Sequence, residues 1–194
     1  GILAAYGILA AYVHKLKTGE GQVVDTSLFE AGIVHTYWQS AIALATGVAP
    51  GPMGSAHPLN GPYQAFETKD GWITIGAANQ RNWERLLDAM EASELADDPR
   101  FKTNTDRMAN LKDLEAVLTP VFQGRTQSDW LARLEAAGVP AGPVLNVCEM
   151  FEDPHAQARD MIPTVEHATI GPMRTLGLPV KLSETPGKVA TAAP

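Results

Sequence analysis

The sequence predicts an α/β fold, on three observations. Two long helical patterns rich in apolar residues open the chain, at residues 1–17 and 27–46. A hairpin signal follows, in which β-like runs at 63–68 and 72–77 flank the turn residues Lys69-Asp70-Gly71. Amphipathic helical patterns and short β-like runs then continue along the remainder of the chain. This mixture of helices and strands indicates an α/β protein.

The composition argues against nucleic acid and against a membrane surface as partners. The 194 residues carry a formal net charge of −7, and the basic residues form no cluster beyond Lys15 and Lys17. Either partner would require a basic face. The apolar stretch from Gly1 to Val13 is too short to span a bilayer and lacks the basic start of a signal peptide. We therefore predict neither nucleic-acid binding nor membrane insertion.

The single cysteine, Cys148, can form neither an intrachain disulfide nor a cysteine metal site. This favours a reducing, cytoplasmic location. The histidines lack partners at ligand spacing, so no metal site is predicted. The chain starts with Gly1 inside a helical pattern, and we expect the sequence to be truncated at that point.

The two opening helices have clear boundaries. The pattern at 1–17 is expected to end at Gly19. The next helix starts after Ser27, where Glu30 completes a capping box, and is expected to run to Thr46. Both patterns are apolar around most of their circumference, so these helices are expected to be buried in a larger body or to cross an interface.

Three amphipathic helices are predicted after the hairpin. Asn79 caps the first of them and Gly138 ends the third. The apolar residues at helical spacing are Trp83, Leu86, Leu87 and Met90, then Met108, Leu111, Leu114 and Leu118, then Trp130, Leu131 and Leu134. We interpret all four tryptophans, Trp38 and Trp72 included, as core residues.

The later elements are shorter. A buried strand is predicted at 141–145, a helix over 147–160 interrupted near Asp153-Pro154, and short strands within 162–183. Residues 185–194 are expected to form a loosely ordered tail. The charged residues of 84–94 and 100–107 are interpreted as a solvated face.

The segment from Pro50 to Pro62 is rich in proline and glycine and is predicted to be a loop. A loop of this length in a compact domain is functional or mobile. Together with the turn at 138–143, it suggests the borders of a central insert. We predict that residues 1–55 belong to the core of a large domain and include a crossing helix. Residues 56–138 then form a small α+β domain, and 139–194 return to the large domain.

A series of short motifs in a fixed order covers nearly the whole chain. They are Gly7 to Ala11, Lys17 to Ala31, Pro62 to Phe66, Thr68 to Ile73, Asp97 to Phe101 with Arg107, Gly138 to Val144, Asp153 to His155 with Arg159, and Gly177 to Pro186. Their order and spacing resemble the C-terminal half of the class III coenzyme A (CoA) transferases of the CaiB/BaiF type. The resemblance implies part of a Rossmann-like large domain plus a small α+β domain, in an interlocked homodimer.

The resemblance also implies an activity. Family members move CoA between carboxylic acids through an aspartyl acyl-enzyme, so the expected substrates are an acyl-CoA and a carboxylate acceptor, with no separate cofactor. The family's aspartate immediately precedes the helix that holds Gly7 to Ala11. We therefore expect the nucleophile, and most CoA-binding residues, before Gly1. Asp25 follows that helix and does not match, so no catalytic residue is assigned within this chain.

Three loop residues are the candidate substrate-binding residues: Gly54, Ser55 and His57. They stand where some members carry a glycine-rich loop that closes over the active-site aspartate. His57 could orient an acceptor carboxylate. The alternative is a plain domain linker with a surface histidine, since glycine and proline mark turns whatever their function.

Two other functions stay open at this point. An α-methylacyl-CoA racemase would keep the fold and move a proton beside the thioester carbonyl. A non-catalytic dimerisation module would keep the fold without chemistry. The apolar first helix argues against the module, because exposing that surface would favour aggregation.

Overall fold

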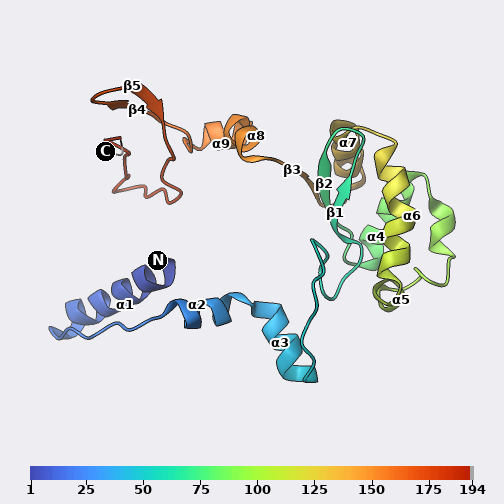
Figure 1. The fold of residues 1–194 in the computed structure, drawn as a ribbon, viewed down its shortest axis with the longest axis horizontal. Coiled ribbons are helices and arrows are strands. Elements are labelled where there is room, and N and C mark those ends of the chain that lie inside the picture. The colour runs from blue at the N-terminus through green and yellow to red at the C-terminus, as the bar shows by residue number, and fades with distance from the viewer. Residues whose placement is uncertain (193–194) are drawn as a thin grey trace. The chain divides into compact units, whose positions relative to one another are not determined.

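The computed structural model describes residues 1–192, in two compact units that divide after Leu59 (Figure 1). The division falls in the proline- and glycine-rich segment, which contains no helix or strand, as predicted. The assignment of 1–55, 56–138 and 139–194 to large-domain core, small domain and return segment stays a prediction. Among the described residues, no helix has the length and apolar character needed to cross a membrane.

Helix α1 (Ile2–Thr18) opens the first unit and ends where the sequence predicts. Gly19 adopts the left-handed conformation, with φ of 82°, and its amide donates to the Lys15 carbonyl oxygen at 2.8 Å. The predicted capping box is also confirmed. The Ser27 hydroxyl oxygen accepts the Glu30 amide at 3.1 Å, and the Glu30 carboxylate accepts the Ser27 amide at 3.1 Å. Local end signals therefore placed both helix boundaries correctly.

The single helix predicted up to residue 46 is instead two, α2 (Leu28–His35) and α3 (Tyr37–Thr46). The chain breaks at Tyr37, whose φ of 35° is unusual for a residue other than glycine. The Thr36 hydroxyl donates to the Ile33 carbonyl oxygen at 2.7 Å. Such a local side-chain bond competes with the helical backbone, which favours a break here.

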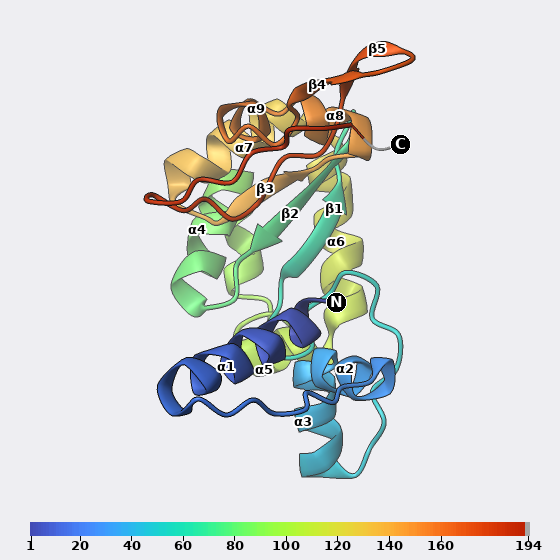
Figure 2. The same ribbon diagram turned by 90° about the vertical axis from the view of Figure 1, so that its left-hand side faces the viewer.

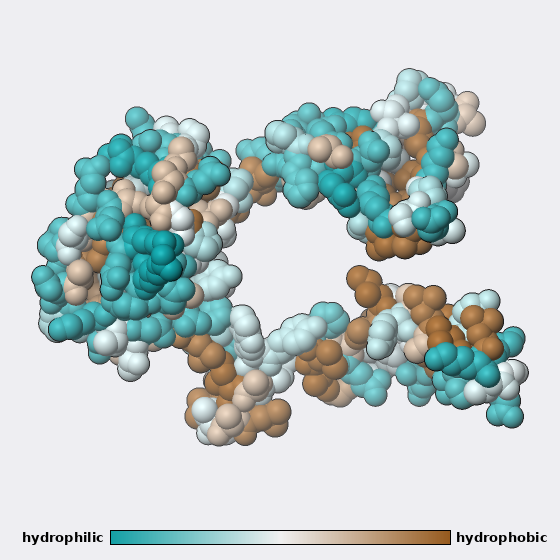
Figure 3. Space-filling view, turned by 180° about the vertical axis from the view of Figure 1, so that it is seen from behind, coloured by the Kyte–Doolittle hydropathy of each residue, from teal (hydrophilic) through white to brown (hydrophobic). Residues whose placement is uncertain are grey.

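The first unit exposes many apolar side chains. No residue of α1, α2 or α3 is buried, and hydrophobic residues lie over the surface of these helices (Figure 3). The most exposed apolar side chains on these helices are Ile2 at 87%, Leu28 at 90%, Phe29 at 78% and Leu44 at 87%. An exposed apolar surface of this kind is typical of an interaction site. It supports the prediction that these helices belong inside a larger body or cross an interface.

The second unit contains a three-stranded antiparallel sheet in the order β1 (Tyr63–Glu67), β2 (Trp72–Gly76), β3 (Ala141–Val144). The predicted hairpin is confirmed, with Phe66 opposite Ile73. Strand β3 joins the sheet after a long helical excursion. The strands of the sheet therefore come from residues 63–76 and 141–144.

Helices cover one face of this sheet (Figure 2). The helices between β2 and β3 are α4 (Gln80–Met90), η1 (Ser93–Ala96), α5 (Asn104–Ala109), α6 (Leu111–Gln123) and α7 (Gln127–Ala137). Asn79 caps α4 and Gly138 ends α7, both as predicted. The second predicted helix is divided at Asn110 into α5 and α6, because Asn110 has a non-helical backbone.

Sheet and helices share one hydrophobic core. The Phe122 ring stacks on Phe66 at 4.8 Å and lies 5.0 Å from the Trp130 ring. The Trp130 indole nitrogen donates to the Phe122 carbonyl oxygen at 2.7 Å, so its polar atom is satisfied inside the core. The other fully buried members are Ile73, Ile75, Ala77, Trp83, Leu86, Leu87, Phe101, Leu114, Leu118 and Leu134.

Several predictions of burial are wrong. Trp83 and Trp130 are core residues as predicted, but Trp38 is 57% exposed and Trp72 is 46% exposed. Strand β3 exists, but none of its residues is buried. Arg107 does not lie on a solvated face, since its exposure is 0%. Sequence periodicity does not distinguish an exposed strand from a buried one, nor a buried cation from a solvated one.

The remainder of the second unit comprises α8 (Val147–Glu152), α9 (Pro154–Ala158) and an antiparallel hairpin of β4 (Thr164–His167) and β5 (Gly171–Arg174). The predicted interruption is confirmed at Asp153, whose carboxylate accepts two amides at the start of α9. Of the predicted tail, residues 193 and 194 lie outside the described residues, and the described part contains no helix or strand.

Candidate functional site

The candidate loop residues lie in a tight turn within the first unit. The Ala56 amide donates to the Met53 carbonyl oxygen at 3.1 Å, which closes the turn. Gly54 has a φ of 61°, in the left-handed region where a side chain would be strained. Gly54 and Ser55 are exposed, and His57 is half-buried. The turn therefore places the Gly54–Ser55 peptide at the surface, from where a loop can contact a ligand.

The ring of His57 is held by contacts within the same unit. Its Nδ1 accepts the Leu59 amide at 3.0 Å. Its centroid lies 4.5 Å from the Trp38 ring of α3, with an angle of 64° between the ring planes. Because Nδ1 is the acceptor, the neutral ring carries its proton on Nε2. In that form His57 has an N–H donor suited to a carboxylate oxygen.

The structure thus brings Gly54, Ser55 and His57 together on one short loop. Their role in substrate binding stays a prediction. His35 and His167 make local bonds of their own, His35 to the Ala31 carbonyl oxygen and His167 from the Thr169 amide. Within residues 1–192, no three His, Cys, Asp or Glu side chains are grouped in a way that could hold a metal ion.

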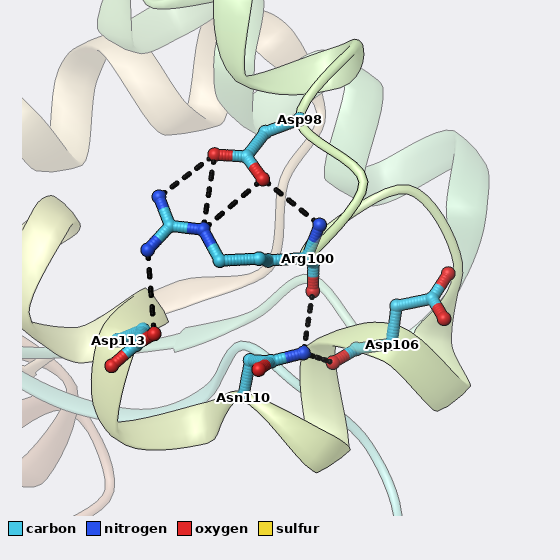
Figure 4. Close-up of polar contacts among 5 residues, drawn as sticks. All are labelled: Asp98, Arg100, Asp106, Asn110 and Asp113. Carbon is cyan, nitrogen blue, oxygen red and sulfur yellow. Dashed lines mark hydrogen bonds and ion pairs between the residues drawn. The ribbon is translucent and has the colours of Figure 1, made fainter.

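A second polar cluster lies in the second unit, where the segment before α5 meets α5 and α6 (Figure 4). Arg100 pairs with Asp98 at 2.8 Å and with Asp113 at 3.3 Å. The Asn110 side-chain amide donates to the carbonyl oxygens of Arg100 at 3.3 Å and Asp106 at 2.9 Å. The Arg100 guanidinium faces two carboxylates, and the bonds join segments of backbone. We interpret the cluster as a structural clip and not as a catalytic site.

The clip has a pH dependence that can be measured. Arg100 donates to the Asp98 carboxylate from its side chain and its backbone amide, which lowers the pKa of Asp98 below its usual value. A carboxyl group whose pKa is lowered in the folded state stabilises the fold at pH values above its ordinary pKa of about 4. This stabilisation is lost as the pH falls through the lowered pKa of the folded state. We expect the wild-type protein to melt at a higher temperature than the Asp98→Asn variant at pH 7. This gap between the two melting temperatures should close in acid.

Melting temperatures of both proteins, measured from pH 7 down to about pH 2, check this prediction. The gap should also shrink at high salt, because the ion pair is exposed. A gap that does not change with pH would contradict the assigned cause.

The whole chain, residues 1–194, matches the model of CoA-transferase family III. The chain belongs to CoA-transferase family III. The α/β fold of CaiB/BaiF type predicted from the sequence motifs is therefore confirmed. A solved structure, a CAIB/BAIF family protein from Brucella suis, superimposes on all of this chain with a TM-score of 0.81 and 33% identity. The chain covers 50% of that protein.

Named relatives within family III are CoA-transferases. The chain is 34% identical over 183 residues to succinyl-CoA:glutarate CoA-transferase of Homo sapiens, covering 94% of this chain and 42% of the relative. It is also 34% identical over 183 residues to acetyl-CoA:oxalate CoA-transferase of Acetobacter aceti, covering 94% of this chain and 46% of that relative. The chain thus spans about half the length of the curated relatives it matches.

Two residues of this family III chain have surroundings that the sequence did not indicate. Trp38 contacts the candidate His57, and no local pattern signals that contact. Arg107 is buried with its guanidinium 5.0 Å from the centroid of the Trp83 ring, and burial lowers the pKa of this group. No local pattern signals the burial of Arg107 either, because its acceptors come from separate segments of the chain.

Proposed function

We propose that this chain is part of an enzyme that transfers CoA between carboxylic acids. The match of the whole chain to CoA-transferase family III carries the proposal. The named relatives use succinyl-CoA with glutarate or mesaconate, and acetyl-CoA with oxalate. Succinate, glutarate, mesaconate and oxalate are all dicarboxylates, so we propose a dicarboxylate as one of the two acids exchanged.

The chemistry proposed is the one that the family resemblance implies. An aspartate carboxylate attacks the donor thioester carbonyl, and the CoA thiolate leaves a mixed anhydride behind. The thiolate then attacks the aspartyl carbonyl, which releases the donor acid and leaves CoA bound to the enzyme as a thioester. The acceptor carboxylate repeats both steps in reverse and restores the aspartate. No residue of this chain is proposed as the nucleophile, and CoA enters as substrate without a separate cofactor.

Within this mechanism we propose that the loop of Gly54, Ser55 and His57 contacts the acceptor carboxylate. The exposed turn and the Nε2 proton of neutral His57 support the proposal, because N–H donors bind carboxylate oxygens in charge-assisted hydrogen bonds. Backbone amides near a reacting carbonyl also stabilise the oxyanion that forms at each addition step.

We also propose an interlocked homodimer and a cytoplasmic location. The exposed apolar side chains of α1 to α3 support an association partner. The free thiol of Cys148 is exposed, which suits a reducing compartment.

Hydroxylamine trapping tests the proposed activity. The full-length protein with succinyl-CoA is expected to lose transferase activity in hydroxylamine, because hydroxylamine attacks the activated aspartyl carbonyl. Without acyl-CoA, the same treatment should leave the activity intact. Exchange of the substrate's α-proton with solvent, without trapping, would instead indicate a racemase. If neither trapping nor exchange is observed, the protein is a non-catalytic module and the proposal is contradicted.

A further inference from the structure

The contact between Trp38 and His57 joins two segments of the first unit that local signals do not connect. Trp38 lies in the first turn of α3, directly after the break at Tyr37. Helix α3 ends at Gly47, in a left-handed conformation with φ of 72°, and the chain then returns so that His57 meets the indole. The loop therefore folds back onto the helix that precedes it.

The indole at this position is not explained by core packing. Trp38 is 57% exposed, whereas Trp83 and Trp130 are at most 1% exposed. A ring separation of 4.5 Å and an interplanar angle of 64° match the edge-to-face arrangement that aromatic pairs prefer. The Trp38 ring therefore makes a specific contact with the imidazole while remaining open to solvent.

This contact complements the hydrogen bond at Nδ1. The second side-chain torsion of histidine is soft, so the ring rotates readily unless it is held. The Leu59 amide fixes which edge of the ring carries Nδ1. Turning the ring over would replace Nδ1 by a carbon and break that bond, and the indole opposes the intermediate rotations. The hydrogen bond at Nδ1 and the contact with the Trp38 indole together determine the direction in which Nε2 points.

We propose that Trp38 is a positioning residue for His57, which orients the imidazole so that Nε2 meets the acceptor carboxylate. The inference deepens the proposed function and rests on it for the identity of the ligand. The alternative is that Trp38 only covers the base of the loop. The positioning role and the covering role differ in whether residue 38 must be aromatic. They also differ in whether removing the ring acts through His57.

The kinetic test uses the full-length protein with succinyl-CoA and glutarate. Trp38→Leu is expected to raise the KM for glutarate about three- to tenfold with little change in kcat, the factor that an aromatic contact is worth. Trp38→Phe keeps an aromatic face and should restore the KM to within about twofold. Ala45→Ser, at an exposed position of the same helix, is the matched control and should leave the KM unchanged.

A double-mutant cycle tests whether Trp38 acts through His57. His57→Asn keeps an oxygen that can accept the Leu59 amide but removes the distal N–H donor. In the His57→Asn background, Trp38→Leu is expected to have no further effect on the KM. If the double variant raises the KM by the product of the two single-variant factors, Trp38 acts independently of His57 and the inference is overturned.

Hydrogen exchange separates this inference from the proposed function. Trp38→Leu should speed exchange of the Leu59 amide about three- to tenfold, because the imidazole acceptor is then less well oriented, and Trp38→Phe should not. Unchanged Leu59 exchange in Trp38→Leu would overturn the positioning role. Faster exchange with an unchanged KM would support positioning and instead overturn the proposed role of the loop in acceptor binding.

Discussion

Replacing Arg107 by methionine is expected to destabilise the second unit by about 3 kcal/mol, since buried acceptors lose their donors. The Nε atom donates to the Gly61 carbonyl oxygen at 2.6 Å, and Nη1 donates to the Phe101 carbonyl oxygen at 2.9 Å and to the Gln80 side chain at 3.2 Å. Methionine fills much of the space but donates nothing.

Two opposing effects decide the size of this loss. Removing a buried cation recovers its desolvation cost, and replacing buried charges by apolar residues is sometimes stabilising for that reason. Here two of the acceptors, those of Gly61 and Phe101, are backbone carbonyls that stay in place after the substitution. Their desolvation is then uncompensated, so the loss exceeds the gain.

Native-state hydrogen exchange of the β1 and β2 amides in the full-length protein measures this loss where it occurs. Arg107→Lys should fall between wild type and Arg107→Met, because one ammonium group cannot reproduce the planar fork of donors. Arg100→Met removes exposed ion pairs and a cation–π contact with the Phe101 ring, and is the matched control, with a much smaller expected effect. Equal losses for Arg107→Met and Arg100→Met would contradict the importance of burial.

Arg107 also illustrates what the sequence could and could not predict. The capping box at Ser27, the Asn79 cap and the ends at Gly19 and Gly138 were predicted because a few neighbouring residues determine each. The burial of Arg107 depends instead on acceptors that come from separate segments of the chain. Local periodicity carries no information about such partners.

The candidate loop likewise has features that the sequence could predict and features that it could not. Its glycines and prolines predicted an irregular segment, and Gly54 occupies the kind of position that requires glycine. The proposed orientation of His57 by Trp38 depends on the contact of α3 with the loop that folds back onto it. The motif resemblance could indicate where a ligand loop stands, but not which neighbouring side chain supports it.

Gly177→Ala is expected to destabilise the C-terminal hairpin segment by about 3 kcal/mol, because the new methyl group meets backbone. A Cβ on Gly177 would lie 2.9 Å from the Cα of Met161 and nearer still to the Asp160 carbonyl oxygen. The Gly177 amide donates to the Met161 carbonyl oxygen at 2.8 Å, so the two segments cannot separate without losing this bond. Backbone atoms, unlike a flexible side chain, have little freedom to move aside.

Gly171→Ala is the matched control because it isolates conformational strain. Gly171 has a φ of 76°, and a Cβ added to this residue would meet no atom within 4 Å. Its substitution is expected to cost about 1 kcal/mol from backbone strain alone. Hydrogen exchange of the Thr175 amide, which donates to the Pro163 carbonyl oxygen at 3.0 Å, reports on the segment in both variants.

A loss in Gly177→Ala no greater than that in Gly171→Ala would contradict the close approach. The expected larger loss would give a physical reason for a glycine that the sequence offered only as the start of a family motif, Gly177 to Pro186. Gly177 is then required by packing between Asp160, Met161 and the returning chain, and not by a left-handed backbone. Its substitution should accordingly act through stability, with the KM for the acceptor unchanged in the protein that remains folded.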